Sequence, residues 1–222
     1  MDIPRLSRRR VAFLIGVPLA WSVLLWFHGG APRDDIYGGL RDEVTRWQIV
    51  HSGTLVFIGL MGLAVYLLVR DLPGRAARLS RLAAGVFVLF YGAWEAVIGL
   101  ATGALVQHAN DVPISERPAV ADAIQSLQDN VIVGDPGVVA AVGALAWITA
   151  TTAAAVAYRR VGAPALVWVL LGLSLVVFAH PPPVGPIGLV CFAAAVGLLH
   201  LSQRRETAAE SSGRERTGAA QV

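Results

Sequence analysis

Residues 82–106 read LAAGVFVLFYGAWEAVIGLATGALV and contain one charged side chain, Glu95. An apolar run of this length can cross a bilayer as a helix, which needs about 20 residues, with roughly 17 to 25 tolerated. Five further apolar runs qualify in the same way. They cover residues 11–27, 49–69, 138–158, 163–179 and 184–201. The sequence therefore predicts an all-α integral membrane protein built as a bundle of six transmembrane helices.

The composition favours the same class. Apolar residues make up 55% of the chain and charged residues 15%, whereas soluble domains carry about 25% charged residues. The mean hydropathy is +0.61. Alanine, valine and glycine are abundant and lysine is absent, which indicates a GC-rich bacterial genome. The single cysteine, Cys191, excludes an intrachain disulfide and a cysteine metal cage.

Arginines in the short connections predict the orientation in the membrane. Fourteen of them fall on one side of the six runs: Arg5, Arg8, Arg9, Arg10, Arg70, Arg75, Arg78, Arg81, Arg159, Arg160, Arg204, Arg205, Arg214 and Arg216. Four lie on the other side: Arg33, Arg41, Arg46 and Arg117. The first side is expected to be cytoplasmic, so both termini of this multi-pass protein would lie inside the bacterial plasma membrane. Because the arginines flank apolar runs, the net charge of +3 does not indicate a nucleic-acid partner.

Three consecutive prolines, residues 181–183, separate the last two runs. Proline cannot continue a helix, so these runs are expected to form a hairpin, with one long bent segment as the alternative. Residues 1–202 are then a single six-helix domain. Residues 203–222, rich in polar and small side chains, form a cytoplasmic tail that is expected to be disordered. The first run is expected to be a retained anchor helix, because Pro32 disfavours signal-peptide cleavage after residues 29–31.

Two short amphipathic helices are predicted in the loops on the outer side. In the first loop the apolar residues with helical spacing are Ile36, Leu40, Val44 and Trp47. In the second they are Val120, Ile124, Leu127 and Val131, after Pro118 in a first helical turn. These helices are either simple connectors or a lid over the outer end of the bundle.

Four histidines lie at span ends that the topology places near the outer face: His28, His51, His108 and His180. Imidazole binds zinc, copper and haem iron, so the set is a candidate metal or haem site. No two of these histidines have the close helical spacing of a specific metal motif. The alternative is that each is a polar residue at the membrane interface.

Glu95 is a more specific candidate for a functional residue than the histidines. A carboxylate at the centre of a span costs about 2.5 to 3.5 kcal/mol on insertion scales and indicates a functional site by default. Tyr91 lies one turn before it, and Gly99 and Thr102 continue roughly the same helix face. Glu95 and Tyr91 are therefore the candidate catalytic residues. The alternative role for Glu95 is a structural hydrogen bond between helices.

The polar start of the next helix suggests where these candidates meet. Ser52 and Thr54 follow His51, and this segment is expected to approach Thr102 and His108. Such residues would line a cleft that opens outward, with Glu95 at its floor. Small residues such as Gly99 and Gly103 are expected to serve close helix packing.

Three functions follow as hypotheses. The first is a ligand-binding or accessory membrane protein with a His/Glu-lined outer cleft. The second is a membrane-embedded, metal-dependent enzyme acting on a lipid or quinone-like substrate, with Glu95 as general acid or base. The third is a small proton-coupled transporter. The expected partners are the lipid bilayer and a lipid or small apolar ligand, and a homo-oligomer is compatible with the sequence.

Overall fold

The structure, a computed structural model, describes residues 4–178 and 181–219. Its regular elements in that part of the chain are all helical. They are α1 (Arg8–Leu25), α2 (Ile36–Leu40), α3 (Val44–Val69), α4 (Arg75–Trp94), the π-helix η1 (Glu95–Ala101), α5 (Thr102–Asp111), α6 (Arg117–Gln128), α7 (Val138–Arg160), α8 (Ala165–Leu173), the 3₁₀ helix η2 (Ser174–Phe178) and α9 (Val184–Ala219). The predicted all-helical class is confirmed.

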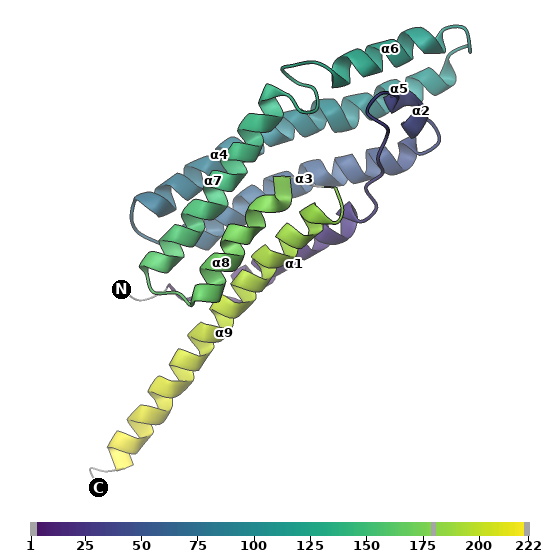
Figure 1. Cartoon of the computed structure of the whole chain (residues 1–222). Helices are drawn as coiled ribbons and strands as arrows, with labels where there is room; N and C mark the ends of the chain where they lie inside the picture. The colour runs from purple at the N-terminus through teal and green to yellow at the C-terminus, as the bar shows by residue number, and fades with distance from the viewer. Residues whose placement is uncertain (1–3, 179–180, 220–222) are drawn as a thin grey trace.

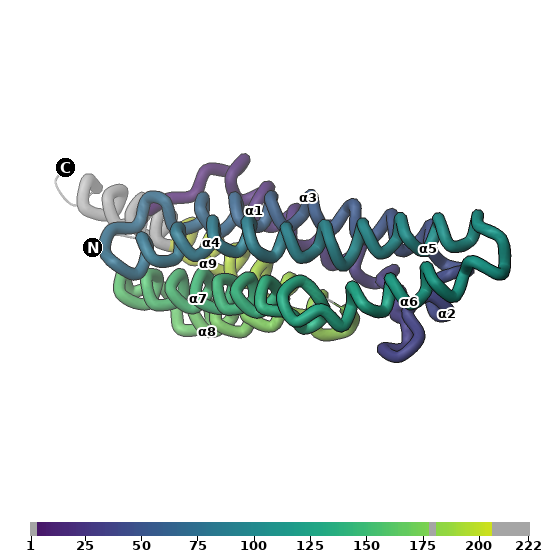
Figure 2. Tube along the Cα trace, turned by 90° about the horizontal axis from the view of Figure 1, so that it is seen from above, coloured from purple at the N-terminus to yellow at the C-terminus, as the bar shows by residue number. Residues whose placement is uncertain are grey.

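The long helices lie side by side and alternate in direction (Figure 1). α4, η1 and α5 form one continuous rod from Arg75 to Asp111. α7 packs along α4, α3 packs against α4 and α1, and α9 packs against α1 and α8. Figure 2 shows the rod along nearly the whole length of the bundle, with α7 and α6 beside it. The bundle therefore has one end formed by α2, α6 and the end of α5, and an opposite end that holds the N-terminus.

Four helices are long and apolar enough to cross a membrane. They are Val44–Val69, Arg75–Asp111, Val138–Arg160 and Val184–Arg205. About half of each is buried inside the bundle, so its other side presents apolar residues outward. Leu63, Leu89 and Leu145 are examples of these exposed side chains. An apolar outer surface of this kind is expected where lipid replaces water.

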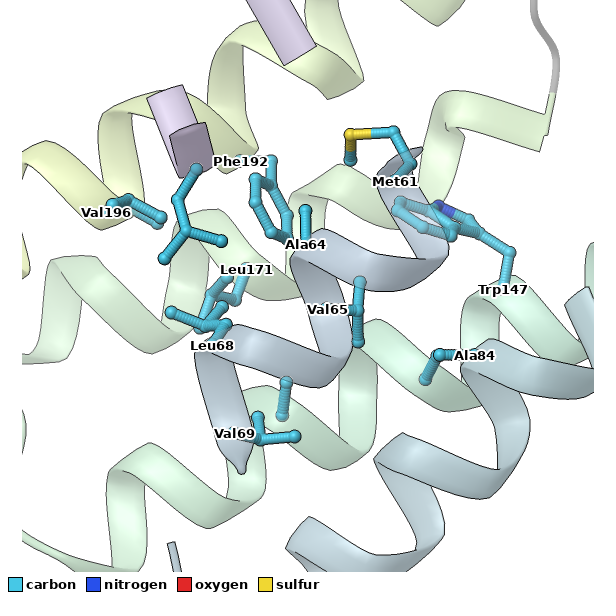
Figure 3. Packing of buried hydrophobic residues seen from close by; sticks show 14 of the residues in the cluster. Met61, Ala64, Val65, Leu68, Val69, Ala84, Trp147, Leu171, Phe192 and Val196 are labelled. Atoms are coloured by element: carbon cyan, nitrogen blue, oxygen red, sulfur yellow. The ribbon is translucent and has the colours of Figure 1, made fainter. Parts of the chain in front are cut away.

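The core is filled by large aromatic residues and by small residues that let the helices approach. Trp147 and Phe192 are fully buried, and Figure 3 shows them around the buried face of α3 with Met61 and Leu68. Ser80 donates a hydrogen bond of 2.8 Å to the carbonyl of Ala150, which ties α4 to α7. Small residues at helix interfaces are typical of membrane proteins, where dispersion contacts between backbones drive association.

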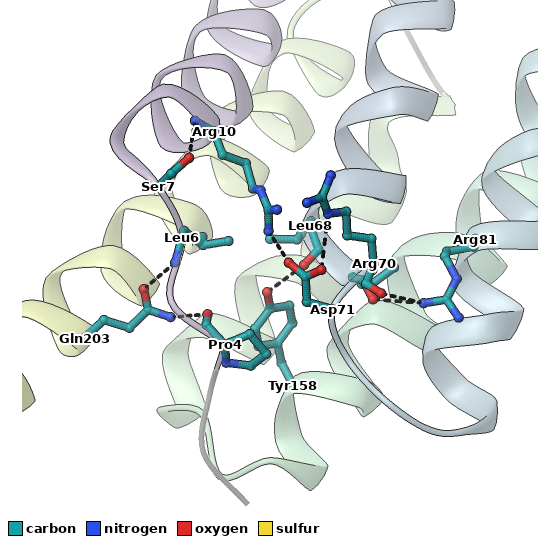
Figure 4. A network of polar contacts seen from close by, with 11 residues as sticks. Pro4, Leu6, Ser7, Arg10, Leu68, Arg70, Asp71, Arg81, Tyr158 and Gln203 are labelled. Atoms are coloured by element: carbon teal, nitrogen blue, oxygen red, sulfur yellow. Dashed lines mark hydrogen bonds and ion pairs between the residues drawn. The ribbon is translucent and has the colours of Figure 1, made fainter.

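The end that holds the N-terminus is tied together by polar contacts between distant segments (Figure 4). The Tyr158 hydroxyl donates to the carbonyl of Leu68 over 2.8 Å, and Gln203 donates to the carbonyl of Pro4 over 2.8 Å. Arg10 pairs with Asp71 at 2.5 Å and, as its hydrogen-bond donor, lowers the pKa of that carboxyl. Four segments thus meet at this end: the N-terminal segment, the α3–α4 turn, the end of α7, and α9. We term it the basic end, because the arginine-rich segments flank these elements.

The structure differs from the sequence expectations at two loops. α2 ends at Leu40 and α3 already begins at Val44, so Val44 and Trp47 belong to α3. A turn at residues 41–43 makes this break, and α2 packs separately, with Leu40 in a small cluster beside α5 and α6. Likewise α6 ends at Gln128, before Val131.

The later helices also end at different positions from those expected. The run 163–179 divides into α8 and η2 at Ser174, whose carbonyl accepts a 2.9 Å hydrogen bond from the Trp147 indole. α9 continues as helix to Ala219, beyond residue 201, although disorder is expected from residue 203. The expected disorder of this tail stays a prediction.

A close backbone contact between α4 and α7 yields the first prediction. A Cβ atom at Gly143 would lie 2.8 Å from the backbone nitrogen of Tyr91, whereas one at Gly85 would meet nothing within 4 Å. Gly143→Ala should therefore lower the free energy of unfolding by about 1–3 kcal/mol, as overpacking does. Gly85→Ala should leave it unchanged or raise it by up to about 1 kcal/mol, because alanine favours helix. Unfolding in detergent, followed by circular dichroism, measures both, and equal effects would contradict the proposed tight contact.

Candidate ligand-binding site

Glu95 lies at the first position of the π-helix η1, inside the α4–α5 rod. Its side chain has no exposed surface within the structure. π-helical turns inside α-helices shift the register of the side chains that follow and often occur at functional sites. The irregular turn at Glu95 therefore adds a second indication, independent of the buried charge, that this part of the rod serves more than packing.

His51 of α3 is the partner of Glu95. Its Nδ1 atom lies 2.5 Å from Oε1 of Glu95, and the His51 residue is 2% exposed. A contact this short between a ring nitrogen and a carboxyl oxygen is a hydrogen bond. The other carboxyl oxygen, Oε2, is buried and accepts no hydrogen bond from the described residues. Glu95 thus fixes the orientation of the His51 ring.

Gly99 makes room for this pair. A Cβ atom at position 99 would lie 2.4 Å from His51 Nδ1, so a larger residue would displace the imidazole. The Gly99 carbonyl also accepts a 2.7 Å hydrogen bond from the indole of Trp47. The sequence pattern attributes Gly99 to helix packing alone, whereas the structure places it directly against the site.

Aromatic rings surround His51 in the half of the bundle opposite the basic end. The Trp47 and His51 ring centroids lie 4.0 Å apart, and those of His28 and His51 lie 4.9 Å apart. His28 also packs edge to face on Trp47, with 5.6 Å between the centroids. The loop after α1 therefore brings His28 to the start of α3, and two imidazoles become neighbours.

These rings border a cavity of about 440 Å³. Its lining comprises His28, Gly29, Gly30, Ala31, Arg33, Ile36, Trp47, His51, Trp94, Ile98, Gln128, Asp129, Asp135, Pro136 and Pro181. Cavities of this size hold small-molecule ligands in other proteins. Glu95 is not part of the lining, so it lies behind His51.

The segment after α6 covers one side of this cavity. Gln128 donates to the Thr102 hydroxyl over 3.0 Å, and the Trp94 indole donates to the carbonyl of Gly134 over 3.0 Å. Arg33 donates to the carbonyl of Asp135. Both ends of the 128–135 segment are thereby attached, and Arg33 anchors it to the loop after α1.

The structure brings some of the predicted site residues together and places others apart. His28, His51 and Glu95 lie together, while His108 is exposed on α5, about 20 Å along the rod from Glu95. His180 lies outside the described residues. Tyr91 is buried below the site and packs on Phe87 and Trp94, with centroids 5.4 and 5.1 Å away.

In the described part of the chain, no three His, Cys, Asp or Glu side chains are grouped so that they could hold a metal ion. The residues that could contribute nitrogen ligands at the cavity are His28 and His51. The metal or haem site therefore stays a prediction, now reduced to these two histidines among the described ones.

Sequence reasoning missed several residues of the site. Trp94 and Gln128 line the cavity, and Arg33 fixes its cover. Trp94 directly precedes Glu95, but a tryptophan inside an apolar run gives no separate signal.

The chain matches no protein-family model, no curated protein and no solved structure.

Burial sets the charge of His28. Desolvation, with a smaller contribution from nearby His51, lowers the pKa of His28 from 6.5 to about 4. The unfolded chain thus binds a proton at His28 below pH 6.5, while the folded protein does not until about pH 4. The contribution of His28 to the free energy of unfolding is therefore complete above pH 6.5 and is lost progressively as the pH falls toward 4.

The second prediction follows from that sign. Between pH 7.5 and 5, His28 should account for a loss of about 2 kcal/mol in the free energy of unfolding. His28→Gln should remove this part of the pH dependence, and His108→Gln, at an exposed position, should not. Denaturant unfolding in detergent at the two pH values measures this difference in the free energy of unfolding. A pH dependence that is the same in all three proteins would contradict the burial of His28.

Proposed function

We propose that this chain is a multi-pass protein of the bacterial plasma membrane that binds a small ligand in an outward-facing cavity lined by histidine. α1 and the shorter apolar helix Ala165–Val177 complete six spans with the four long apolar helices. The basic end is cytoplasmic under the positive-inside rule, so the cavity opens to the outside. α2 and α6 then lie at the outer membrane interface.

The observation that carries the binding function is the buried contact between Glu95 and His51 at the wall of the cavity. Burying a carboxylate in a span is costly, and a bond to His51 offsets that cost only in part, since Oε2 stays without a hydrogen bond to the described residues. A purely structural bond between helices would not need an imidazole that borders a cavity. A carboxylate that orients a histidine is, however, the usual arrangement behind a histidine that binds a metal ion.

The lining supports a ligand of a particular kind. The walls include the rings of Trp47 and Trp94 and the side chain of Ile98, which suit an apolar or flat molecule. Two acids and one arginine also line the cavity, which disfavours an anion. With a pKa of about 4, His28 is neutral at pH 7 and could bind a metal or haem iron without releasing a proton.

One observation favours a second function, a membrane-embedded enzyme for a lipid or quinone-like substrate. Glu95 begins an irregular helical turn and lies 2.5 Å from His51 Nδ1, and a carboxyl bonded to an imidazole is a pair that can move a proton in general acid–base catalysis. In that case His51 would exchange the proton with substrate and Glu95 would hold the ring. A transporter has less support, because fully buried Phe87 and Trp147 pack below the site toward the basic end.

A binding experiment with three probes tests the proposal. Detergent-purified protein is titrated with Zn²⁺, with haemin and with a short-chain quinone, and tryptophan fluorescence is recorded, since Trp47 and Trp94 line the cavity. We expect a saturable change with at least one probe. His51→Ala should weaken that binding at least 10-fold, which is the lower end of the effect of disturbing a bound ligand's support.

His108→Ala is the matched control, because it removes a histidine that lies away from the cavity. It should bind the probe like the wild type. Glu95→Gln should bind more weakly than the wild type while keeping its fold, as judged by circular dichroism. Absence of saturable binding for all three probes, or equal binding by wild type and His51→Ala, would refute the proposed ligand site.

A further inference from the structure

A second concave surface lies far from the histidines, between α4 and α7 at the basic end. It is a groove of about 590 Å³. Its lining consists of Arg75, Ala76, Leu79, Ile148, Thr149, Thr152, Ala153, Val156 and Arg160. Figures 1 and 2 show α4 and α7 side by side along this part of the bundle. We term it the α4–α7 groove.

The position of the groove matches one leaflet of a bilayer. Along α7 it runs from Ile148, near the middle of the helix, to Arg160 at its end. Twelve residues of α-helix extend about 18 Å, and half of a hydrocarbon core is about 15 Å. The wall is made of small or apolar side chains, and the Thr149 hydroxyl is bonded to the carbonyl of Leu145. The wall therefore suits an acyl chain.

The mouth of the groove is positively charged. Arg75 begins α4 and Arg160 ends α7, both are exposed, and neither forms an ion pair with a described acid. None of the described residues that line the groove is acidic. Asp71, an acid of the neighbouring turn, is already paired with Arg10 and Arg70. Two guanidinium groups above an apolar channel suit a phosphate headgroup above an acyl chain.

We propose that the α4–α7 groove binds one anionic phospholipid from the leaflet at the basic end. Arg75 and Arg160 hold the headgroup phosphate, and an acyl chain lies along Leu79 and Val156. Basic pockets between membrane helices are known to bind anionic headgroups in this way. The inference rests on the membrane location proposed above and is independent of the ligand in the outer cavity.

Native mass spectrometry of the detergent-purified protein tests this, with phosphatidylglycerol and phosphatidylcholine as probes. We expect phosphatidylglycerol to bind at least 10-fold more tightly. Each arginine near an anionic headgroup contributes roughly a five-fold effect, so Arg75→Gln with Arg160→Gln should weaken phosphatidylglycerol binding roughly 25-fold.

The charge-matched control is Arg78→Gln with Arg159→Gln. Neither residue lines the groove, and Arg159 lies over the ring of Trp168, 5.4 Å from its centroid. This control should change binding less than two-fold. Equal binding of the two lipids would mean that the groove does not prefer an anionic headgroup, and equal losses in the two double variants would mean an unspecific attraction to charge. Either result would overturn the proposal.

A pair of bulky substitutions tests the acyl channel. Thr152→Trp fills the groove, while Leu145→Trp places the same side chain on an exposed part of α7 outside it. Only Thr152→Trp should weaken phosphatidylglycerol binding, and wild-type binding by that variant would overturn the channel. His51→Ala should bind phosphatidylglycerol normally. A chain that stays soluble without detergent would instead refute the membrane location itself.

Discussion

The half of this bundle opposite the basic end depends on one contact, the 2.5 Å approach of His51 Nδ1 to Glu95 Oε1. A carboxylate cannot stay buried among apolar helices without a polar partner. Because His51 supplies that partner, α3 must lie close to the rod at this level, and only glycine at position 99 leaves enough space. The Trp47 bond to the Gly99 carbonyl and the edge-to-face packing of His28 on His51 lie at the same close approach, next to the π-helical turn.

The two ends of the bundle solve different physical problems. At the basic end, hydroxyl, amide and guanidinium groups satisfy backbone carbonyls where helices stop, as Tyr158 does for Leu68 and Arg81 for Val69. These bonds fix the turns at the basic end. At the other end, Gln128, Trp94 and Arg33 use their bonds to hold a covering segment in place over a cavity. The bonds at the basic end hold the helices in place and those at the other end hold the covering segment, so the bundle offers a preformed cavity beside His51.

Sequence reasoning reached the helical class and singled out Glu95, because both follow from local composition. The neighbourhood of His28 and His51 follows from topology, since ends of antiparallel helices meet, and the polar faces of the two neighbouring spans place Glu95 at the floor of the cleft. The position of His108 could not be derived, because the rod continues past the level of His51 and carries this residue outward on α5. The π-helix was also hidden, since a register change depends on how α3 packs and not on the local sequence. The role of Gly99 was missed for the same reason.

The arrangement of charge along the bundle links the two proposed sites. The cavity lining carries an excess of acid with histidine beside it, whereas the described lining of the α4–α7 groove carries two arginines and no acid. Under the proposed orientation, the ligand of the cavity and a lipid of the opposite leaflet would meet linings of opposite charge. The same arginines that orient the chain under the positive-inside rule would then also retain an anionic lipid. Such a lipid would lie against α4 and α7, the helix pair with the most extensive contact in the bundle, and would fill a gap that small side chains leave on its lipid-facing side.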